Sequence, residues 1–389
     1  MRVASRRLHV LMVGWEFPPH HAGGLGVHSY ELCRELTQLG HRVTFLTPFA
    51  GPFTEVEGVT FVTPSAPAGA PGAPPGTYDR VLEPDGRVAD AITAYNDWVG
   101  ALRTPRDFDL VHVHDWFGTV GAVGLAARRR RPLVMTVHST EFDRSLGWPH
   151  PDILERERVG MRAADRVIAV SRHLKQQLVD RYSVPADRIR VVYNAVRPTD
   201  RLRRLEAPDP IVLYLGRLAA MKGVDTFLRA AAKVAPHAPR ALFVVAGDGP
   251  EYPRLLTLAA HLGIADRVLF LGWVNEEERT ILLGRASVYV LPSVVEPFGI
   301  SALEAMVSGV PTIVSKTSGV AEITETVFAV DFWDIDEFAS RIAELLSYPA
   351  LRNVMGRATR RAALGATWAE RARETVAVYL EVVGSGRAG

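Results

Sequence analysis

The feature that most constrains the fold is an alternation of short apolar runs with helical stretches, repeated in two consecutive series. In the first series the runs rich in β-branched and aromatic residues fall near residues 8–14, 42–47, 59–63, 110–113, 132–137, 166–170 and 189–192. In the second they fall near residues 211–215, 242–246, 267–271, 287–291, 311–314 and 327–330. Strands that alternate with helices form parallel sheets with crossover helices, so the sequence predicts an α/β protein with two doubly wound domains.

A charged, proline-rich stretch from Arg197 to Pro210 separates the two series and shows no apolar periodicity. Such a stretch predicts a linker rather than a helix or strand. We therefore expect one domain over residues 1–198 and a second over residues 209–365. Residues 366–389 follow, and their apolar positions from Trp368 to Val383 recur at helical spacing, which predicts a terminal helix.

Composition excludes several classes of protein. The chain has 389 residues, of which 48% are hydrophobic, enough for two large cores. Its one cysteine, Cys33, rules out an internal disulfide framework and shares a helix side with Tyr30, Leu36 and Leu39, which predicts a core position. The formal net charge of +2 is too small to indicate nucleic-acid binding.

The sequence gives little indication of a membrane span or a signal peptide. No run approaches the ~18 apolar residues of a membrane span. The basic N-terminus resembles the start of a signal peptide, but Gly14 to Glu16 interrupt the apolar stretch that follows and no cleavage site is present. The stretch is therefore predicted to be the first strand. We therefore expect a cytoplasmic protein of unassigned oligomeric state. The run Arg128–Arg131 is expected to end a helix, with contact to a lipid surface as the alternative. The Ala-Pro-Gly stretch Pro64–Gly76 is expected to be a mobile loop of unassigned role.

The segment from Glu296 to Glu304 carries two carboxylates, eight residues apart, around a turn that leads into a helix. Unpaired amides of Phe298, Gly299 and Ile300 at the helix start can donate hydrogen bonds to a ligand, and the carboxylates can accept them from sugar hydroxyls. Eight helical residues rise ~12 Å, whereas the carboxyl groups of a retaining hydrolase lie ~5 Å apart. The two glutamates are therefore not expected to be a hydrolase pair.

Gly23 and Gly24 follow the first predicted strand and open a helix near Val27. Glycine amides can approach a phosphate without obstruction by a Cβ atom. A Gly-Gly turn is more often a structural loop, however, and the spacing is not that of a dinucleotide-binding motif. Both interpretations of this turn stay open.

His114 and Asp115 end one predicted strand, and His138 ends the next. Polar groups at neighbouring strand ends of a doubly wound sheet predict a binding site. Zinc is the rival interpretation, but His112 and His114 straddle a strand, and no helical histidine pair or cysteine completes a recognisable set of ligands. We therefore expect no metal here.

Arg217 and Lys222 follow the first strand of the second series, five residues apart around a turn. Arginine suits bidentate contacts to oxygen and lysine acts as a compact charge, so the pair can stabilise a diphosphate without a metal ion. Two cations on an exposed loop would be the alternative.

Several motifs together resemble the retaining nucleotide-sugar glycosyltransferases of family four, which have the GT-B architecture. They are, in chain order, Gly14-Trp-Glu-Phe-Pro-Pro-His-His-Ala-Gly-Gly-Leu-Gly26, His112-Val-His-Asp-Trp116, Thr136-Val-His-Ser-Thr-Glu141, Gly216-Arg-Leu-Ala-Ala-Met-Lys-Gly223, Gly247-Asp-Gly-Pro250 and Glu296-Pro-Phe-Gly-Ile-Ser-Ala-Leu-Glu304. The glycogen-synthase-like members are the most similar subgroup, on Trp15-Glu-Phe-Pro-Pro and Ser315-Lys-Thr-Ser-Gly319. One difference is His21, which stands where those enzymes carry a lysine.

The resemblance implies two Rossmann-like domains with an interdomain cleft, the N-terminal domain on the acceptor side and the C-terminal domain binding the nucleotide sugar. It also implies that the terminal helix crosses back to the N-terminal domain. The reaction it implies is transfer of a hexosyl unit, most readily glucosyl from ADP-glucose or UDP-glucose, to an α-glucan or other saccharide. The leaving phosphate would help to remove the acceptor proton. No cofactor is implied.

Roles for individual residues follow from the same resemblance. His138 corresponds to the residue that faces the transferred sugar, with His114 and Asp115 supporting it or contacting the acceptor. Arg217 and Lys222 match the family's diphosphate cations. Our hypothesis is that Glu304 binds the ribose and Glu296 the donor hexose. Gly247 and Val274 lie where the family's base-binding loops occur.

Three alternatives remain at this point. The acceptor could be a small molecule or a lipid-linked sugar. The chain could also be a non-catalytic subunit that binds a sugar nucleotide for a partner enzyme. Epimerisation of a sugar nucleotide uses a similar architecture, but the Glu-Pro-Phe-Gly motif favours transfer.

Metal dependence gives the first prediction. No Asp-x-Asp cluster directly follows a predicted strand to hold a divalent ion, and Arg217 and Lys222 supply the positive charge. Hexosyl transfer should therefore survive exhaustive treatment with EDTA, measured as product formed per enzyme. Complete loss of activity that magnesium or manganese restores would contradict the prediction.

Overall fold

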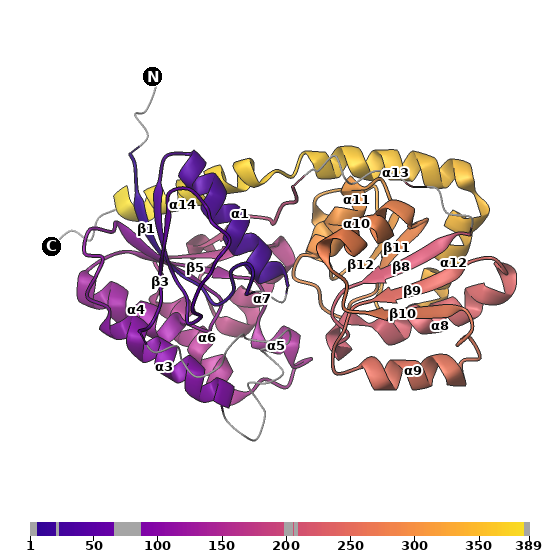
Figure 1. The fold of residues 1–389 in the computed structure, drawn as a ribbon, viewed down its shortest axis with the longest axis horizontal. Helices are drawn as coiled ribbons and strands as arrows, with labels where there is room; N and C mark the ends of the chain where they lie inside the picture. Colours follow the sequence, from indigo (N-terminus) through magenta and orange to yellow (C-terminus); the bar gives the residue numbers. More distant parts are fainter. Residues whose placement is uncertain (1–5, 21–22, 66–86, 198–204, 206–208, 385–389) are drawn as a thin grey trace. The chain divides into compact units, whose positions relative to one another are not determined.

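The computed structural model describes residues 6–20, 23–65, 87–197, 205 and 209–384 (Figure 1). The chain divides into two compact units. The N-terminal unit comprises residues 1–194 together with 368–389, and the C-terminal unit comprises Ala195–Thr367. His21, most of the predicted linker and most of the Ala-Pro-Gly stretch lie outside the described residues.

The N-terminal unit is built on a seven-stranded parallel sheet in the order β3-β2-β1-β4-β5-β6-β7. Its strands are β1 (His9–Val13), β2 (Arg42–Leu46), β3 (Val59–Val62), β4 (Leu110–His114), β5 (Leu133–Val137), β6 (Arg166–Ala169) and β7 (Ile189–Val191). Its helices are α1 (Gly24–Gln38), α3 (Arg87–Ala101), α4 (Thr119–Arg129), α5 (Glu141–Arg144), α6 (Pro151–Ala163), α7 (Arg172–Tyr182), the 3-10 turn Ala186–Arg188 and α14 (Trp368–Gly384).

The C-terminal unit is built on a six-stranded parallel sheet in the order β10-β9-β8-β11-β12-β13. Its strands are β8 (Ile211–Leu215), β9 (Leu242–Ala246), β10 (Val268–Gly272), β11 (Val288–Leu291), β12 (Thr312–Ser315) and β13 (Phe328–Val330). Its helices are α8 (Val224–Val234), α9 (Tyr252–His261), α10 (Glu276–Arg285), α11 (Ile300–Val307), α12 (Ile335–Ser347) and α13 (Pro349–Leu364), with 3-10 turns at Ala220–Lys222, Ala235–His237 and Gly319–Glu322.

The predicted parallel α/β organisation is confirmed in both units. In each sheet the chain starts on a central strand, moves to one edge, returns and moves to the other edge, which is doubly wound topology. The central strands are buried along their whole length, as in β1, β4 and β5, because helices cover both faces of such a sheet. Among the described residues, no helix combines the length and apolar character needed to span a bilayer.

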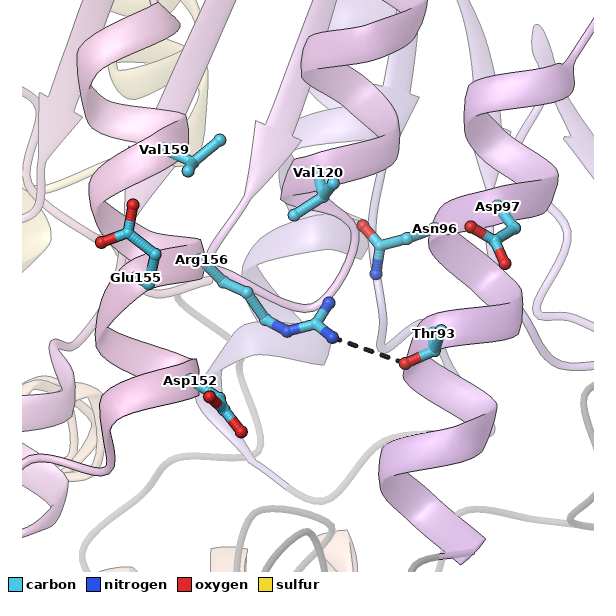
Figure 2. A pocket seen from close by; sticks show the side chains of 8 residues that line it. All are labelled: Thr93, Asn96, Asp97, Val120, Asp152, Glu155, Arg156 and Val159. Atoms are coloured by element: carbon cyan, nitrogen blue, oxygen red, sulfur yellow. Dashed lines mark hydrogen bonds between the residues drawn. The ribbon is translucent and has the colours of Figure 1, made fainter.

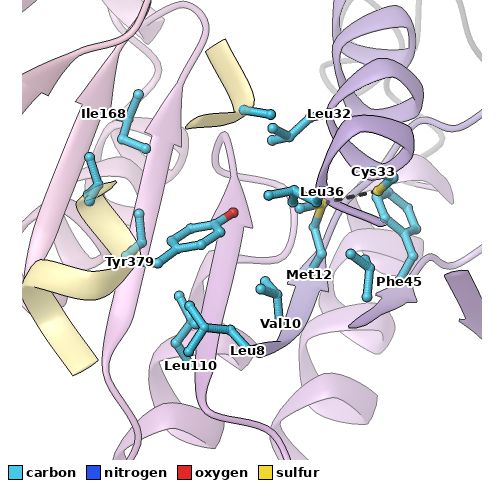
Figure 3. Close-up of a cluster of buried hydrophobic side chains, with 14 of the residues drawn as sticks. Leu8, Val10, Met12, Leu32, Cys33, Leu36, Phe45, Leu110, Ile168 and Tyr379 are labelled. Carbon is cyan, nitrogen blue, oxygen red and sulfur yellow. Dashed lines mark hydrogen bonds between the residues drawn. The ribbon is translucent and has the colours of Figure 1, made fainter. Parts of the chain in front are cut away.

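The last helix, α14, completes the hydrophobic core of the N-terminal unit. It packs on α1, and its Ala372, Val378 and Tyr379 are buried in a cluster with Cys33 and Met12 (Figure 3). The Cys33 thiol lies 3.5 Å from the Met12 sulfur and is fully buried, which confirms the predicted core position and raises the pKa of the thiol. Removal of this helix would expose one side of the sheet.

Polar contacts also fix α14 in place. The Tyr379 hydroxyl lies 2.7 Å from Nδ1 of His112 on β4. At the helix surface, Glu381 pairs with Arg166 on β6 and with Arg190 on β7, at 2.9 and 2.8 Å. Half-exposed ion pairs contribute little each, so the buried apolar face supplies most of the stability.

The arginine run Arg128–Arg131 ends α4, as predicted. Arg130 has a φ of +51°, which stops the helix. Arg128 donates hydrogen bonds to the carbonyl oxygens of Gly100 and Leu102, and Arg129 also donates to Leu102, at 3.2 Å. These carbonyls lie at the C-terminal end of α3, where a helix leaves acceptors unpaired. Arg128 and Arg129 thus supply hydrogen-bond donors to carbonyl oxygens that the end of α3 leaves unpaired.

Two glycines with the same backbone conformation give a matched test of packing in the C-terminal unit. Gly223 (φ +64°) and Gly263 (φ +69°) are both left-handed. A Cβ at Gly223 would lie 2.0 Å from the carbonyl oxygen of Pro292, whereas at Gly263 it would meet no atom within 4 Å. Gly263→Ala should cost about 1–2 kcal/mol for the conformation alone. Gly223→Ala should cost a further ~1–3 kcal/mol because the loop must move away from Pro292.

Urea unfolding of the two variants measures this difference. Both replacements lower the entropy of the unfolded chain equally, so that contribution cancels between them. Equal destabilisation by Gly223→Ala and Gly263→Ala would show that the loop after β8 does not depend on close contact with the loop after β11.

Candidate functional site

Polar side chains gather at the carboxyl ends of β4 and β5 in the N-terminal unit. The two strands are neighbours, and His114 is the last residue of β4, while His138 directly follows β5. Nδ1 of His114 lies 3.2 Å from Nε2 of His138. Asp115 has a φ of +52°, and its Oδ1 accepts a hydrogen bond from the backbone N–H of His138 at 2.7 Å. The structure therefore brings together the three polar residues that the sequence singled out here.

A further histidine, His28, joins this group from a distant part of the chain. It lies in the first turns of α1 and is 4% exposed. Its ring centre is 4.4 Å from that of His138 and 5.3 Å from that of His114. Its Nδ1 lies 2.8 Å from Oδ1 of Asn194. We call His28, His114 and His138 the histidine cluster.

Sequence reasoning missed His28, although the sequence contains a sign of it. His28 shares a helix face with Leu32 and Leu36, at i, i+4 and i+8, and both leucines are buried. A polar residue in an otherwise apolar stripe is a candidate for function, because its burial costs free energy unless a partner compensates. Neither the partner Asn194 nor the neighbouring rings can be read from local spacing.

Burial determines the charge of the histidine cluster. It lowers the pKa of His28 and His114 well below the usual range, with neighbouring histidine charges adding to the effect, and lowers the pKa of His138 to about 3. The rings are therefore neutral near pH 7, each with one N–H donor and one acceptor nitrogen. Burial also raises the pKa of Asp115 to about 6, opposed by Arg144 and by the backbone N–H donors of His138 and Ser139.

The start of α1 is the place where the sequence suggested a phosphate site. Gly23 precedes the helix and Gly24 is its first residue. Gly23 has an extended φ of −173°, and a Cβ there would meet nothing within 4 Å, so neither strain nor packing demands glycine. The carboxylate of Glu16 accepts from the Gly26 N–H at 3.2 Å. One amide of this helix start is thus already paired with a carboxylate.

In the C-terminal unit, Glu296 and Lys222 form an ion pair. Nζ of Lys222, in the turn after β8, lies 2.8 Å from Oε2 of Glu296, in the loop after the neighbouring strand β11. Their side chains are 21% and 10% exposed. Ser293 also donates to the same carboxylate oxygen, at 3.3 Å. Sequence reasoning placed the two residues on different parts of a ligand and did not foresee this contact, which joins residues 74 positions apart.

Glu304 has a separate partner. It lies on α11 and pairs with Arg279 on α10 at 3.2 Å. Burial raises the pKa of its carboxyl group, and Arg279 opposes that shift. Because Glu296 and Glu304 contact different cations on different elements, they do not act as one pair of carboxylates.

The glycines of this unit hold the neighbouring loops close together. Gly247 has a φ of +147°, and a Cβ there would lie 1.8 Å from the carbonyl oxygen of Gly216. Its N–H donates to the carbonyl of Gly272 at 2.7 Å. The three loops after β8, β9 and β10 therefore touch through their backbones. Arg217 lies in the first of them, and its carbonyl accepts from the Tyr214 hydroxyl at 2.8 Å.

The remaining predicted residues surround the start of α11 and the loop after β10. Gly299 has a φ of +101° and precedes α11, whose first residue is Ile300. Phe298 is buried, and its carbonyl accepts from the Val320 N–H at 2.7 Å. Val274 is half-buried and directly precedes Asn275, the N-terminal cap of α10. The structure thus collects these residues at the carboxyl edge of the second sheet.

A pocket of about 340 Å³ lies elsewhere, between α3, α4 and α6 (Figure 2). Asp97, Asp152 and Glu155 contribute to its lining with one cation, Arg156, which lies 3.4 Å from the Thr93 hydroxyl. None of the residues predicted from sequence lines it. The predicted site residues therefore lie at the strand ends and not at this pocket.

Comparison with known proteins shows the family of the chain. The family model described as Glycosyltransferase Family 4 matches residues 22–200, and the model described as Glycosyl transferases group 1 matches residues 198–362. An uncharacterized glycosyltransferase of Methanocaldococcus jannaschii is 31% identical, over 81% of this chain and 82% of its own. The glycogen synthase of Mycobacterium tuberculosis is 29% identical, over 96% and 94%.

Two further relatives have different names. A D-inositol 3-phosphate glycosyltransferase of Catenulispora acidiphila is 30% identical, over 94% of this chain and 92% of its own. The solved structure of a sucrose-phosphate synthase from Thermosynechococcus elongatus superposes with a TM-score of 0.80 at 22% identity, over 97% and 100%. With the two parallel sheets and the strand-end residues described above, these matches show that the chain belongs to the family-four glycosyltransferases of GT-B fold, in the glycogen-synthase-like group.

Proposed function

We propose that this glycosyltransferase moves a glucosyl unit from a nucleoside diphosphate sugar to an α-glucan or other saccharide, with retained configuration and without a metal ion. The observation that carries the proposal is the Lys222–Glu296 pair at the ends of β8 and β11. A buried carboxylate held 2.8 Å from an ammonium group combines a charge for a phosphate with an acceptor for sugar hydroxyls.

The donor is assigned to the C-terminal unit. Lys222 and Arg217 neutralise the diphosphate, since one unit charge pair at ~4 Å is worth about 4 kcal/mol at an effective dielectric of 20. Amides at the start of α11, from Phe298 to Ile300, add hydrogen-bond donors. Glu304 binds the ribose hydroxyls, and Glu296 the hydroxyls of the hexose. Gly247 and Val274 lie on the side of the base.

The N-terminal unit supplies the contacts to the transferred sugar and the acceptor. A neutral His138 can donate a hydrogen bond to one sugar hydroxyl or accept one from it. Asp115 positions His138 through its backbone N–H, and His114 adjoins the ring. The turn at Gly23 and Gly24 is assigned to phosphate contact through its remaining amides.

The reaction proposed for these residues is the one that the family resemblance implies. The bond between the anomeric carbon and the phosphate oxygen breaks, and the acceptor oxygen forms its bond to the same face of that carbon. The departing phosphate oxygen takes the acceptor proton. Glu296 is not a nucleophile in this scheme, because its carboxylate is neutralised by Lys222 and also accepts from Ser293.

A small-molecule acceptor is the second candidate. It is favoured by four relatives named for D-inositol 3-phosphate, one of which is 30% identical over 94% of this chain. The glycogen synthase relative, 29% identical over 96%, favours a glucan instead. An activity assay is therefore needed to identify the acceptor, whereas both candidate functions use a nucleoside diphosphate sugar as donor.

A donor panel tests the proposal. Thermal unfolding should be measured with ADP-glucose, UDP-glucose, GDP-mannose and the free diphosphates, because a ligand at 100 times its Kd stabilises the folded protein by about 2.7 kcal/mol. ADP-glucose or UDP-glucose should stabilise most and should then be consumed with glycogen or a small acceptor such as inositol phosphate. Binding of a donor without turnover on any acceptor would favour the non-catalytic alternative.

Substitution of the ion pair separates the two roles. Lys222→Ala should lower kcat about 10²–10³-fold, because charge on the leaving oxygen grows in the transition state. It should also weaken binding of the free nucleoside diphosphate, because a positive charge is lost. Glu296→Gln should impair transfer but bind the free diphosphate as tightly as the native protein or more tightly, because Lys222 loses a competing anion. Calorimetry with the diphosphate and transfer rates measure both effects.

Lys233→Ala is the matched control. Lys233 lies on α8 in the same unit and forms an exposed pair with Asp336 at 2.7 Å, so its loss should change neither quantity. If Glu296→Gln weakened binding of the diphosphate as severely as Lys222→Ala, Glu296 would act in binding the phosphates. Its assignment to the hexose would then be wrong.

A further inference from the structure

We propose that the histidine cluster, His28, His114 and His138, binds a divalent transition-metal ion such as Zn²⁺, and that the bound ion inhibits hexosyl transfer. The metal-binding part stands on the geometry of the cluster alone. The inhibitory part rests on the proposed role of His138 at the transferred sugar.

The distances suit an ion held by imidazoles. One ring nitrogen from each of the three residues lies within 4.8 Å of those of the other two. Nδ1 of His114 and Nε2 of His138 are already 3.2 Å apart. Tetrahedral Zn²⁺ with Zn–N bonds of 2.0–2.1 Å separates its nitrogen ligands by about 3.3 Å. The ring nitrogens therefore have to approach one another by at most about 1.5 Å to reach this spacing.

Two buried nitrogens of the cluster lack a partner. Nε2 of His28 and Nε2 of His114 form no hydrogen bond to any part of the chain that the structure describes. Oδ1 of Asn194 accepts from Nδ1–H of His28 at 2.8 Å, which leaves the lone pair of His28 on Nε2. Protein ligands to zinc are commonly held in this way, with the second ring nitrogen bound to an oxygen acceptor. An ion would satisfy Nε2 of His28, whose burial otherwise costs free energy, while Nε2 of His114 stays the N–H of that ring when Nδ1 binds the ion.

The surrounding groups define which ion fits. The neighbouring His112 is occupied at both nitrogens, by the Tyr379 hydroxyl and the Thr136 hydroxyl, each at 2.7 Å, so among the described residues the set consists of three histidines. A set of imidazole nitrogens favours Zn²⁺, Cu²⁺, Ni²⁺ or Co²⁺ over Mg²⁺ and Ca²⁺, which prefer oxygen. Three protein ligands leave the fourth position for water, and His138 is the partly exposed member through which solvent reaches the cluster.

This site is compatible with transfer that needs no metal. The sequence argument against zinc considered only ligands from the strand ends, and the third histidine comes from α1. An ion on His138 would hold the ring that the proposed reaction uses to contact a sugar hydroxyl. The ion would therefore compete with the substrate and would not activate it, and a chelator would raise activity in protein that carries the ion.

Direct binding measurements test the site in the full chain. After removal of metals, titration with Zn²⁺ followed by calorimetry should show one ion per chain, and Co²⁺ should give the strong visible absorption of four-coordinate cobalt. His28→Asn should weaken Zn²⁺ binding more than about 100-fold, and Asn194→Leu about 10–100-fold, as expected for a ligand and its supporting group. His261→Asn, at the exposed end of α9, is the control and should bind as the native protein does.

Two observations would overturn the site. One is unchanged Zn²⁺ affinity in a His28→Asn variant whose melting temperature without metal matches that of the native protein. If that variant does not fold, X-ray absorption at the zinc edge of the unmodified protein decides, and fewer than three imidazole ligands would refute the proposal.

Inhibition is measured separately. Zn²⁺ should reduce transfer with the same midpoint as binding, and EDTA should reverse the loss. Stoichiometric binding without inhibition would refute the inhibitory part alone. If no donor is turned over at all, the proposed function fails, while the calorimetric and cobalt measurements still decide the metal site.

Discussion

Parallel pairing of the strands is the constraint on which every candidate residue depends. In a parallel sheet all carboxyl ends lie at one edge, so the loops after neighbouring strands must meet there. That is how His114 reaches His138, and how Lys222 after β8 reaches Glu296 after β11. The sheet interior is apolar and rigid, which allows the edge to hold polar groups that would be costly elsewhere.

The local sequence pattern was sufficient to predict the strands and most of the polar residues at their ends. Apolar runs such as 211–215 and 287–291 coincide with β8 and β11 to within a residue, because a strand buried on both faces leaves a continuous apolar signature. What the sequence did not indicate was the pairing of these residues. The contact between His28 and Asn194 spans 166 positions, and that between Lys222 and Glu296 spans 74. Such partners follow from tertiary packing, and no spacing rule contains them.

Burial gives the two groups of polar residues opposite characters. In the N-terminal unit desolvation lowers the pKa of each histidine of the cluster, so that unit offers neutral donors and acceptors. In the C-terminal unit Glu296 and Glu304 each pair with a cation, Lys222 at 2.8 Å and Arg279 at 3.2 Å. Neutral imidazoles suit sugar hydroxyls or a metal ion, whereas paired charges suit an anionic ligand that can exchange one partner for another.

This difference explains why the donor is easier to infer than the acceptor. A diphosphate imposes fixed demands for positive charge and amide donors, which we propose that Lys222 and the start of α11 meet, and Gly299 before α11 has a φ of +101° that favours glycine. An acceptor hydroxyl demands only one hydrogen bond and an approach to the anomeric carbon, which many side chains can provide. Recognition of the rest of the acceptor then depends on surface loops, whose sequences are under weaker physical constraint than a strand end. Relatives named for molecules as different as glycogen and D-inositol 3-phosphate are what this division of constraints would produce.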